Sequence, residues 1–298
     1  MLIKIDETLK HLSGIRSGVI KQGLKLDIEE IDEYIRFKPS NFNVILGHAN
    51  VGKTTVILYL MLLYTKRHNI RWLVFSSENE PYSIIRKLVE FLDLNPLNKI
   101  EEKNYKKHLD YVNKYFKIID SSELYTYKTL LETATNVKKA WEYHGFLIDP
   151  YNSLSKDHAL MKGVGSHEYD YQATSEIRLF CKSNNISVWL NTHANTNALR
   201  MKHPVGHEFT GHPIPPLASD VEGGGKFVNR ADDFWVLHRY LQHPVDWINS
   251  KIHVETGGRP TPIEEPIVLS SIKNNVGFEI NGKKLLDIPL RDKNHIPF

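Results

Sequence analysis

One short stretch limits the folds open to this chain more than any other feature. Residues 47–54 read GHANVGKT and satisfy the pattern G-x-x-x-x-G-K-[ST]. The apolar run NVILG leads into it and the stretch TVILYLMLLYTKRH follows it, which predicts a buried strand, then the loop, then a helix. In this setting backbone N–H groups can surround phosphates at a helix N-terminus. The motif therefore predicts a nucleotide-binding α/β domain.

The residues of this loop have different expected roles. Lys53 is expected to reach the β- and γ-phosphates of ATP, and the hydroxyl of Thr54 is expected to ligate Mg²⁺. The other positions expected to contact nucleotide are Gly47, His48, Ala49, Asn50, Val51, Gly52 and Thr55. A fortuitous glycine loop would not explain why strand, loop and helix coincide, so ATP and Mg²⁺ are the expected cofactors.

A second part of the site is expected where another apolar strand ends in an acid. The run GFLID (145–149) ends in Asp149, whose carboxylate would hold Mg²⁺ through water. Asp120 ends FKIID (116–120) and is the alternative, but Ser-Ser follows it rather than a second apolar segment. Because Asp also commonly starts turns, the choice of Asp149 depends on the presence of the phosphate loop.

Hydrolysis needs a carboxylate that orients and deprotonates the attacking water. Glu78 ends the predicted strand 70–78 and is expected to be this base. The alternative is that Glu78 is an acid favoured by the dipole of the helix that starts at Pro81. Glu80 could play either part.

A polar side chain at the end of the predicted strand 186–193 could report loss of the γ-phosphate. Thr192 and His193 stand there, and His193 is the expected sensor. The alternative is a hydrogen-bonded histidine at a strand end without a role in catalysis.

Strand and helix patterns alternate along the chain, which indicates a mainly parallel α/β sheet. Strands are predicted over 43–47, 70–78, 116–120, 145–149, 186–193, 231–239 and 266–275, and helices over 55–68, 81–92, 125–143 and 173–185. Residues 277–290 predict a C-terminal antiparallel hairpin with Asn281-Gly282 at its turn. Ile28, Ile31 and Ile35 have helical spacing within 27–37, so residues 1–35 are expected to form an arm or linker helix and residues 36–298 the ATPase domain.

Composition supports an ordinary globular protein and excludes some classes. The net charge of +3 over 298 residues is too small to indicate nucleic-acid binding by itself. Cys181 is the single cysteine, so an internal disulfide is impossible and a reducing compartment is expected. No apolar run approaches the roughly 20 residues that span a bilayer. We expect a cytoplasmic protein with no membrane partner.

The order of the motifs resembles the RecA-like motor domain of DnaB-type hexameric replicative helicases, including bacteriophage versions. The matching segments, within residues 30–290, are GHANVGKTT, LVFSSE, FKIIDSS, GFLIDPYNSL, VWLNTHANTN and LASDVEGGGKFVNRADDFWVLHR. The resemblance implies a RecA-like P-loop NTPase core and an ATP-dependent DNA helicase of replication. Such a helicase forms a ring, hydrolyses ATP between subunits and moves on single-stranded DNA. A primase, loader or polymerase would be its partner, in a bacterial cell or a phage-infected host.

The resemblance also implies roles for individual residues. Lys53, Thr54, Glu78, Asp149 and His193 keep the roles given above. The loop between Asn195 and Arg230 would line the central channel of the ring and hold DNA. Its expected DNA-binding residues are Asn195, Arg200, Lys202, Lys226 and Arg230. The local charge balance supports this only weakly, because Glu208, Asp220 and Glu222 offset the cations, and a mobile surface loop is the alternative.

Two departures from the resembling pattern matter. A Lys-x-Arg usually stands near the late strand, where the arginine serves the neighbouring subunit's ATP, but this chain has Asn275 in that place. Lys273 is the expected substitute and Arg259 the second choice, although both could be ordinary solvated residues. A separate N-terminal primase-binding domain is also not expected ahead of residue 36. Two rival functions stay open: a RecA-like recombinase or mediator, and a non-motor ATPase such as a helicase loader.

Overall fold

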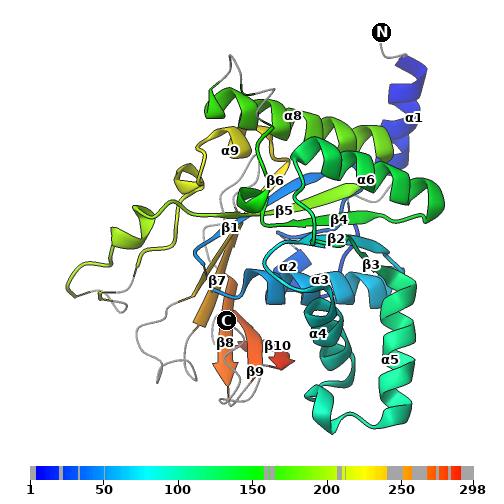
Figure 1. Cartoon of the computed structure of the whole chain (residues 1–298), viewed down its shortest axis with the longest axis vertical. Helices are drawn as coiled ribbons and strands as arrows, with labels where there is room; N and C mark the ends of the chain where they lie inside the picture. The colour runs from blue at the N-terminus through cyan, green and yellow to red at the C-terminus, as the bar shows by residue number, and fades with distance from the viewer. Residues whose placement is uncertain are drawn as a thin grey trace.

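The computed structural model describes most of the chain, namely residues 5–19, 23–32, 34–49, 51–157, 161, 165–206, 210–211, 213–239, 251–256, 267–272, 275–280 and 283–289. Within these ranges the strands form one sheet in the order β10-β9-β8-β7-β6-β1-β5-β4-β2-β3 (Figure 1). The sheet has a parallel part that carries the nucleotide motifs and an antiparallel extension beyond β6.

The parallel part comprises β1 to β6, and each strand is a short apolar run. Their bounds are β1 Phe42–Gly47, β2 Trp72–Ser76, β3 Phe116–Ile118, β4 Gly145–Asp149, β5 Ser187–His193 and β6 Asp233–Arg239. β1 lies between β5 and β6, with Val44 opposite Leu190 and Ile45 opposite Trp235. Because all these strands run the same way, their carboxyl ends meet at one edge, where ligands bind in open α/β sheets.

The antiparallel extension confirms the predicted C-terminal hairpin. It consists of β7 Lys251–Thr256, β8 Ile267–Ile272, β9 Asn275–Ile280 and β10 Lys283–Pro289. β9 and β10 pair antiparallel, with Lys283 opposite Ile280. The predicted turn residues Asn281 and Gly282 lie outside the described residues.

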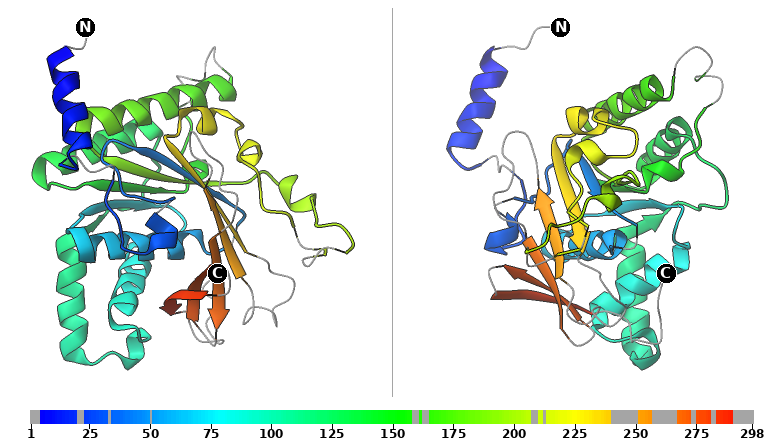
Figure 2. Two further views of the ribbon diagram at one scale, coloured as in Figure 1. Left: turned by 180° about the vertical axis from the view of Figure 1, so that it is seen from behind. Right: turned by 90° about the vertical axis from the view of Figure 1, so that its left-hand side faces the viewer.

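Helices cover both faces of the parallel part. On one face lie α3 Lys53–His68, α4 Pro81–Asp93 and α5 Glu102–Tyr115, and on the other lie α6 Tyr127–Ala140, α8 Ser166–Asn184 and α9 Lys226–Arg230 (Figures 1 and 2). Successive strand side chains point to opposite faces, so Ile45 packs on the α3 side and its neighbours Val44 and Leu46 pack on the α8 side. Each face therefore has its own apolar core.

Large aromatic side chains fill the core on the α3 side. The Trp72 and Trp189 rings have centroids 5.0 Å apart, Trp189 and Trp235 4.8 Å, and Phe37 and Trp72 5.4 Å. Gly145 makes room for this cluster, since a β-carbon there would lie 2.2 Å from the Trp72 ring. These rings hold the middle strands of the sheet in register under the nucleotide motifs.

The N-terminal segment differs from the helix predicted over 27–37. Only α2, Glu29–Asp32, is α-helical there. The Asp32 carboxylate accepts hydrogen bonds from the backbone of Leu26 at 2.6 Å and of Ile28 at 3.2 Å. Ile31 and Ile35 are buried in the α3-side core, so burial rather than a long helix explains their spacing. By contrast, α1 Ile5–Arg16 has no buried residue and projects from the body (Figure 2).

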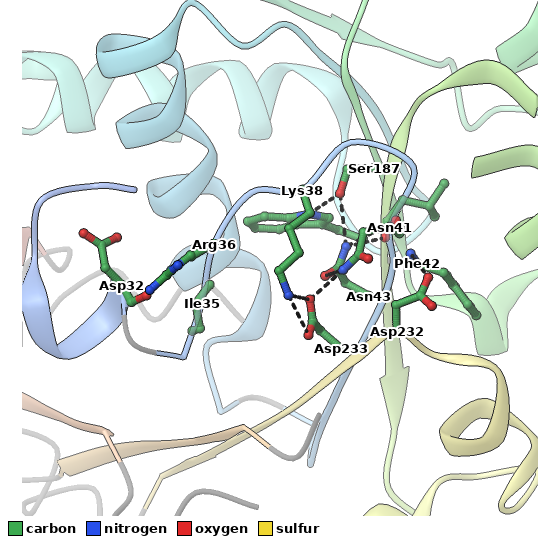
Figure 3. A network of polar contacts seen from close by, with 12 residues as sticks. Asp32, Ile35, Arg36, Lys38, Asn41, Phe42, Asn43, Ser187, Asp232 and Asp233 are labelled. Carbon is green, nitrogen blue, oxygen red and sulfur yellow. Dashed lines mark hydrogen bonds and ion pairs between the residues drawn. The ribbon is translucent and has the colours of Figure 1, made fainter. Parts of the chain in front are cut away.

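A polar network secures the chain where it enters the sheet (Figure 3). The ammonium of Lys38 lies 3.0 Å from Asp233 Oδ2, and Asn41 donates to the same carboxylate. Asn43 Nδ2 donates to Ser187 Oγ at 3.1 Å. The network joins the starts of β1, β5 and β6, at the edge opposite the phosphate loop, and so fixes the strands without taking part in the nucleotide site.

Two helices depart from the predictions. α8 begins at Ser166, well before the predicted start at 173, and α5 was not predicted. In α5 only Val112 and Tyr115 are buried, and lysines occupy much of its exposed surface, so the apolar period that signals a helix is weak.

Candidate nucleotide site and the adjacent loop

The phosphate loop connects β1 to α3 at the carboxyl edge of the sheet. Gly52 precedes α3 with φ of 94°, a conformation that favours glycine. A β-carbon on Gly47 would lie 2.5 Å from the carbonyl oxygen of Leu237 on β6, so glycine is needed there for close packing. The loop thus ends on a helix N-terminus, where backbone N–H groups and the helix dipole favour phosphate.

Lys53 is held inside this loop. Its side chain is only 7% exposed, and its ammonium donates to the carbonyl oxygens of Gly47 at 3.0 Å and His48 at 2.8 Å. Burial lowers the pKa of Lys53 to about 8, while the charges of Asp149 and Glu78 oppose the shift. The ammonium is therefore a desolvated cation at the place where phosphates would be bound.

Asp149 is the most enclosed acid of the site. It ends β4, is 1% exposed, and accepts hydrogen bonds from Thr54 Oγ1 at 2.7 Å, from Asn191 Nδ2 at 2.6 Å and from Ser76 Oγ at 3.3 Å. Burial raises the pKa of Asp149, and the hydrogen bonds from Asn191 and Thr54 oppose that rise. The structure thus brings together the two predicted metal-site residues.

These contacts fit a bound Mg²⁺ ion. Mg²⁺ prefers oxygen ligands and usually keeps several waters beside one or two protein groups and substrate phosphates. The Thr54 hydroxyl and the Asp149 carboxylate supply such oxygens side by side, next to the loop that holds Lys53. Asp120, the alternative acid, instead binds Ser122 locally at 2.8 Å.

Glu78, His193 and Lys53 form a chain of contacts. His193 Nε2 lies 3.1 Å from Glu78 Oε1, and His193 Nδ1 lies 3.4 Å from the Lys53 ammonium. The hydrogen bond from His193 is the main reason that the pKa of Glu78 lies below its usual value, so Glu78 is ionised at neutral pH. Glu80 takes a different place, at the cap of α4, where its carbonyl oxygen accepts from Ser83.

The other predicted loop residues vary in position. Val51 is buried, and Asn50 lies outside the described residues. His48 is buried with its ring 6.0 Å from that of His238 on β6, and burial lowers its pKa. Ala49 and Thr55 complete the loop and the first turn of α3.

Sequence reasoning missed three polar residues of the site: Ser76, Asn191 and Asn152. Asn191 had a signal, since it is a lone amide within the apolar strand WLNTH and stands two positions before His193 on the same face. Asn152 had none. It lies in a short 3-10 turn, Tyr151–Ser153, and its side chain contacts residues far away in sequence.

A long loop begins where β5 ends. Its legs are joined at the base by a bridge between Ala194 and Val221 and by a hydrogen bond from Asn195 N to Asp220 O of 2.8 Å. Farther out Lys202 bridges to Pro213. Figure 1 shows this segment projecting from the body of the molecule. Leu199, Met201 and Val205 are among its exposed side chains.

The predicted DNA-binding residues fall into two groups. Arg200 and Lys202 are exposed on the projecting part of the loop. Lys226, however, is only 4% exposed, and its ammonium lies 3.4 Å from the buried carboxylate of Asp170. Its position differs from the surface location that the prediction requires, because an internal carboxylate neutralises it. Arg230 stacks on the Tyr171 ring at 4.3 Å and hydrogen-bonds its hydroxyl. Lys273 and Arg259 lie outside the described residues.

The fold and the phosphate loop together define a RecA-like P-loop NTPase fold. Among solved structures, the chain is similar to the ATPase domain of a phage helicase, with a TM-score of 0.71 at 14% identity over 98% of this chain and 100% of that one.

It is also similar to a DnaB-like replicative helicase whose structure is described together with its interactions with primase, with a TM-score of 0.66 at 16% identity. That match covers 92% of this chain and 66% of the helicase. The KaiC-like protein PH0186 from Pyrococcus horikoshii gives a TM-score of 0.51 at 14% identity, over 91% of this chain and 98% of that one. No family model and no curated protein matches the sequence.

At these identities the matches establish the fold. They confirm the predicted fold class and its resemblance to the motor domain of DnaB-type helicases. Within the described part of the chain, no helix is both long and apolar enough to cross a bilayer.

Proposed function

We propose that this protein is the ATP-hydrolysing motor of a DNA helicase of replication. The observation that carries the proposal is one junction at the carboxyl edge of the sheet. His193 there contacts both Lys53 and Glu78 through its side chain, and the projecting loop starts at the next residue. A nucleotide site and a candidate DNA-binding loop are therefore one residue apart.

The proposed chemistry assigns a task to each side chain. Bound Mg²⁺–ATP supplies the phosphoryl group and the metal charge that neutralises it. Lys53 binds and orients the β- and γ-phosphates, and Thr54 and Asp149 hold the metal ion. Glu78 accepts a proton from the attacking water. His193 positions Glu78 and responds to the loss of the γ-phosphate.

The proposed DNA contacts lie on the loop after His193. Arg200 and Lys202 are exposed there and can neutralise phosphates of single-stranded DNA. Asn195 and the backbone at Gly223 and Gly224, where φ is 101° and 91°, can add uncharged contacts. Lys226 is left out of this set because Asp170 already pairs with it.

We further propose a homo-oligomeric ring, hexameric by analogy, with ATP held between subunits. Lys273 would supply the trans-acting cation in place of the arginine that Asn275 replaces. Residues 1–35 would act as an arm or linker and residues 36–298 as the motor. A primase, loader or polymerase would be its partner, and the cytoplasm of a bacterium or of a phage-infected host its place of action.

One experiment separates this function from its rivals. The ATPase rate is measured with and without single-stranded DNA, together with the native mass and strand displacement. A helicase motor is stimulated by DNA, forms a ring and displaces a strand. A recombinase or mediator is stimulated but coats DNA as a filament. A loader-type ATPase hydrolyses slowly without stimulation, and this last result would overturn the proposal.

A further inference from the structure

Asn152 holds the end of β5 from below. Its side-chain oxygen accepts hydrogen bonds from Thr192 Oγ1 and from the backbone N–H of His193, both at 2.9 Å. Asn152 follows Asp149 by three residues, in the short turn after β4. The main chain of the sensor histidine is therefore fixed by the segment that leaves the metal-site acid.

The other end of the same amide reaches the projecting loop. Asn152 Nδ2 donates to Glu222 Oε2 at 3.0 Å, and the backbone N–H of Glu222 donates to the carbonyl oxygen of His193 at 2.9 Å. Asn152, His193 and Glu222 thus form a closed ring of hydrogen bonds. Both backbone polar groups of His193 are held within it.

Glu222 stands at the foot of the returning leg of the loop. The bridge between Ala194 and Val221 lies directly before it, and two glycines with positive φ, Gly223 and Gly224, lie directly after it. Val221 is buried, so this point is anchored, while the two glycines beyond it are not buried. A displacement of the leg by a bound strand would reach Asn152 through the Glu222 carboxylate.

We propose that Asn152 is a positioning residue that couples DNA bound by the loop to the Glu78–His193 pair. The inference rests on the proposed function, because it assumes that the loop binds DNA. Asn152 touches neither nucleotide-binding group. It acts by moving the backbone of His193, whose ring contacts both Glu78 and Lys53.

The position requires an amide. Asn152 must accept two hydrogen bonds on one side and donate one on the other, and an amide has both capacities on one planar group. An aspartate would keep the acceptor toward His193 but would place a second carboxylate against Glu222, and like charges at this distance repel. Asn152→Asp therefore breaks only the link to the loop.

The test compares ATPase stimulation, defined as the rate with saturating oligo-dT divided by the rate without it. Asn152→Asp is expected to lower this ratio by about 10-fold, the usual size of a coupling between two sites. Glu222→Gln alone keeps an acceptor for Asn152 and should stay within about two-fold of wild type. The double variant Asn152→Asp/Glu222→Gln restores the donor–acceptor pair in the reverse direction and should recover the ratio.

Controls separate coupling from general damage. Asn136→Asp makes the same chemical change on the exposed face of α6 and should leave the ratio unchanged. Glu222→Ala removes the acceptor from the loop side and should lower the ratio as Asn152→Asp does, even if Asn152→Asp folds poorly. A purely structural role would lower the unfolding temperature and would not be rescued by the double variant.

The outcomes are distinct. If the wild type is stimulated and Asn152→Asp and Glu222→Ala are stimulated equally, the coupling is wrong and the proposed function stands. A double variant that remains uncoupled also overturns the coupling. If DNA does not stimulate the wild type, the proposed function falls and the coupling falls with it.

Discussion

The proton on His193 can be assigned from its two neighbours. Glu78 is an ionised acceptor 3.1 Å from Nε2, so Nε2 carries the proton. The Lys53 ammonium can only donate, so Nδ1, at 3.4 Å, presents its lone pair. A neutral imidazole with this tautomer satisfies both contacts. At the scale of single residues, His193 is therefore a neutral link between the predicted base and the phosphate-binding cation.

The first prediction concerns the base. Glu78→Gln is expected to bind ATP as the wild type does and to hydrolyse it at least about 100-fold more slowly, since an amide cannot accept the proton of the attacking water. Glu80→Gln is the matched control, because Glu80 caps α4 instead. Single-turnover hydrolysis and nucleotide binding are measured for both. Near-normal hydrolysis by Glu78→Gln would move the role to another residue.

The second prediction concerns pH. The pKa of Lys53 is lowered to about 8 by burial, so the ammonium is present below that pH and is lost above it. Phosphate binding needs the charged form, and kcat/KM reports groups of the free enzyme. We therefore expect kcat/KM for ATP to fall as pH rises through about 8. Lys53→Arg should remove this alkaline limb, because guanidinium stays charged. An alkaline limb unchanged in Lys53→Arg would assign the titration to another group.

At the scale of elements, the sequence predicted the parts that follow from local pattern. Apolar runs that end in Gly47, Glu78, Asp149 and His193 indicated the strands and their polar ends, because the period and the punctuation are local. α5 was missed, since its buried residues are few. The burial of Lys226 was missed as well, because its partner Asp170 lies 56 residues away and only the fold brings them together. The same holds for Asn152 and Glu222.

The third prediction tests the packing that supports these strands. Gly145→Ala would place a methyl group 2.2 Å from the Trp72 ring, and overpacking of this kind costs about 1 to 3 kcal/mol. The free energy of unfolding is measured by denaturant titration. Gly225→Ala is the control, because open space surrounds that position and its φ of −60° suits alanine. Equal stabilities of the two variants would contradict the close contact at Trp72.

The fourth prediction tests the projecting loop. Replacing Arg200 and Lys202 together with alanine is expected to weaken binding of single-stranded DNA and to reduce its salt slope by about 1.4, because each lost phosphate contact releases fewer counterions. The control removes the same charge from Lys103 and Lys107, which are exposed on α5. Affinity is measured by fluorescence anisotropy over a range of salt. If both pairs behave alike, the loop is not a specific DNA contact.

At the scale of the whole molecule, the nucleotide site has one enclosed side and one open side. Lys53 and Asp149 are buried, whereas the Glu78 side chain is 51% exposed. Water-excluded sites strengthen the electrostatic contacts on which phosphoryl transfer depends. A second subunit placed over the open side would complete such a site. This asymmetry supports the proposal that ATP is held between subunits.

The last prediction follows from that arrangement. A cation supplied in trans is worth about 10³ to 10⁵ in the rate of phosphoryl transfer. Lys273, the proposed source of that cation, belongs to the neighbour's half of each site, whereas Lys53 belongs to the subunit's own half. A Lys53→Ala subunit and a Lys273→Ala subunit should each be inactive alone. When they are mixed, some interfaces will combine an intact Lys53 with an intact Lys273, so part of the activity should return.

Specific activity should also rise with protein concentration until the ring is complete, and native mass measured on the same samples should rise with it. Arg259→Ala replaces Lys273→Ala in a parallel mixture, since Arg259 is the alternative source of the cation. Recovery in only one of the two mixtures identifies the residue that acts across the interface. A monomeric preparation that hydrolyses ATP at the full DNA-stimulated rate would rule out a trans-acting cation, because a single chain would then hold the complete site.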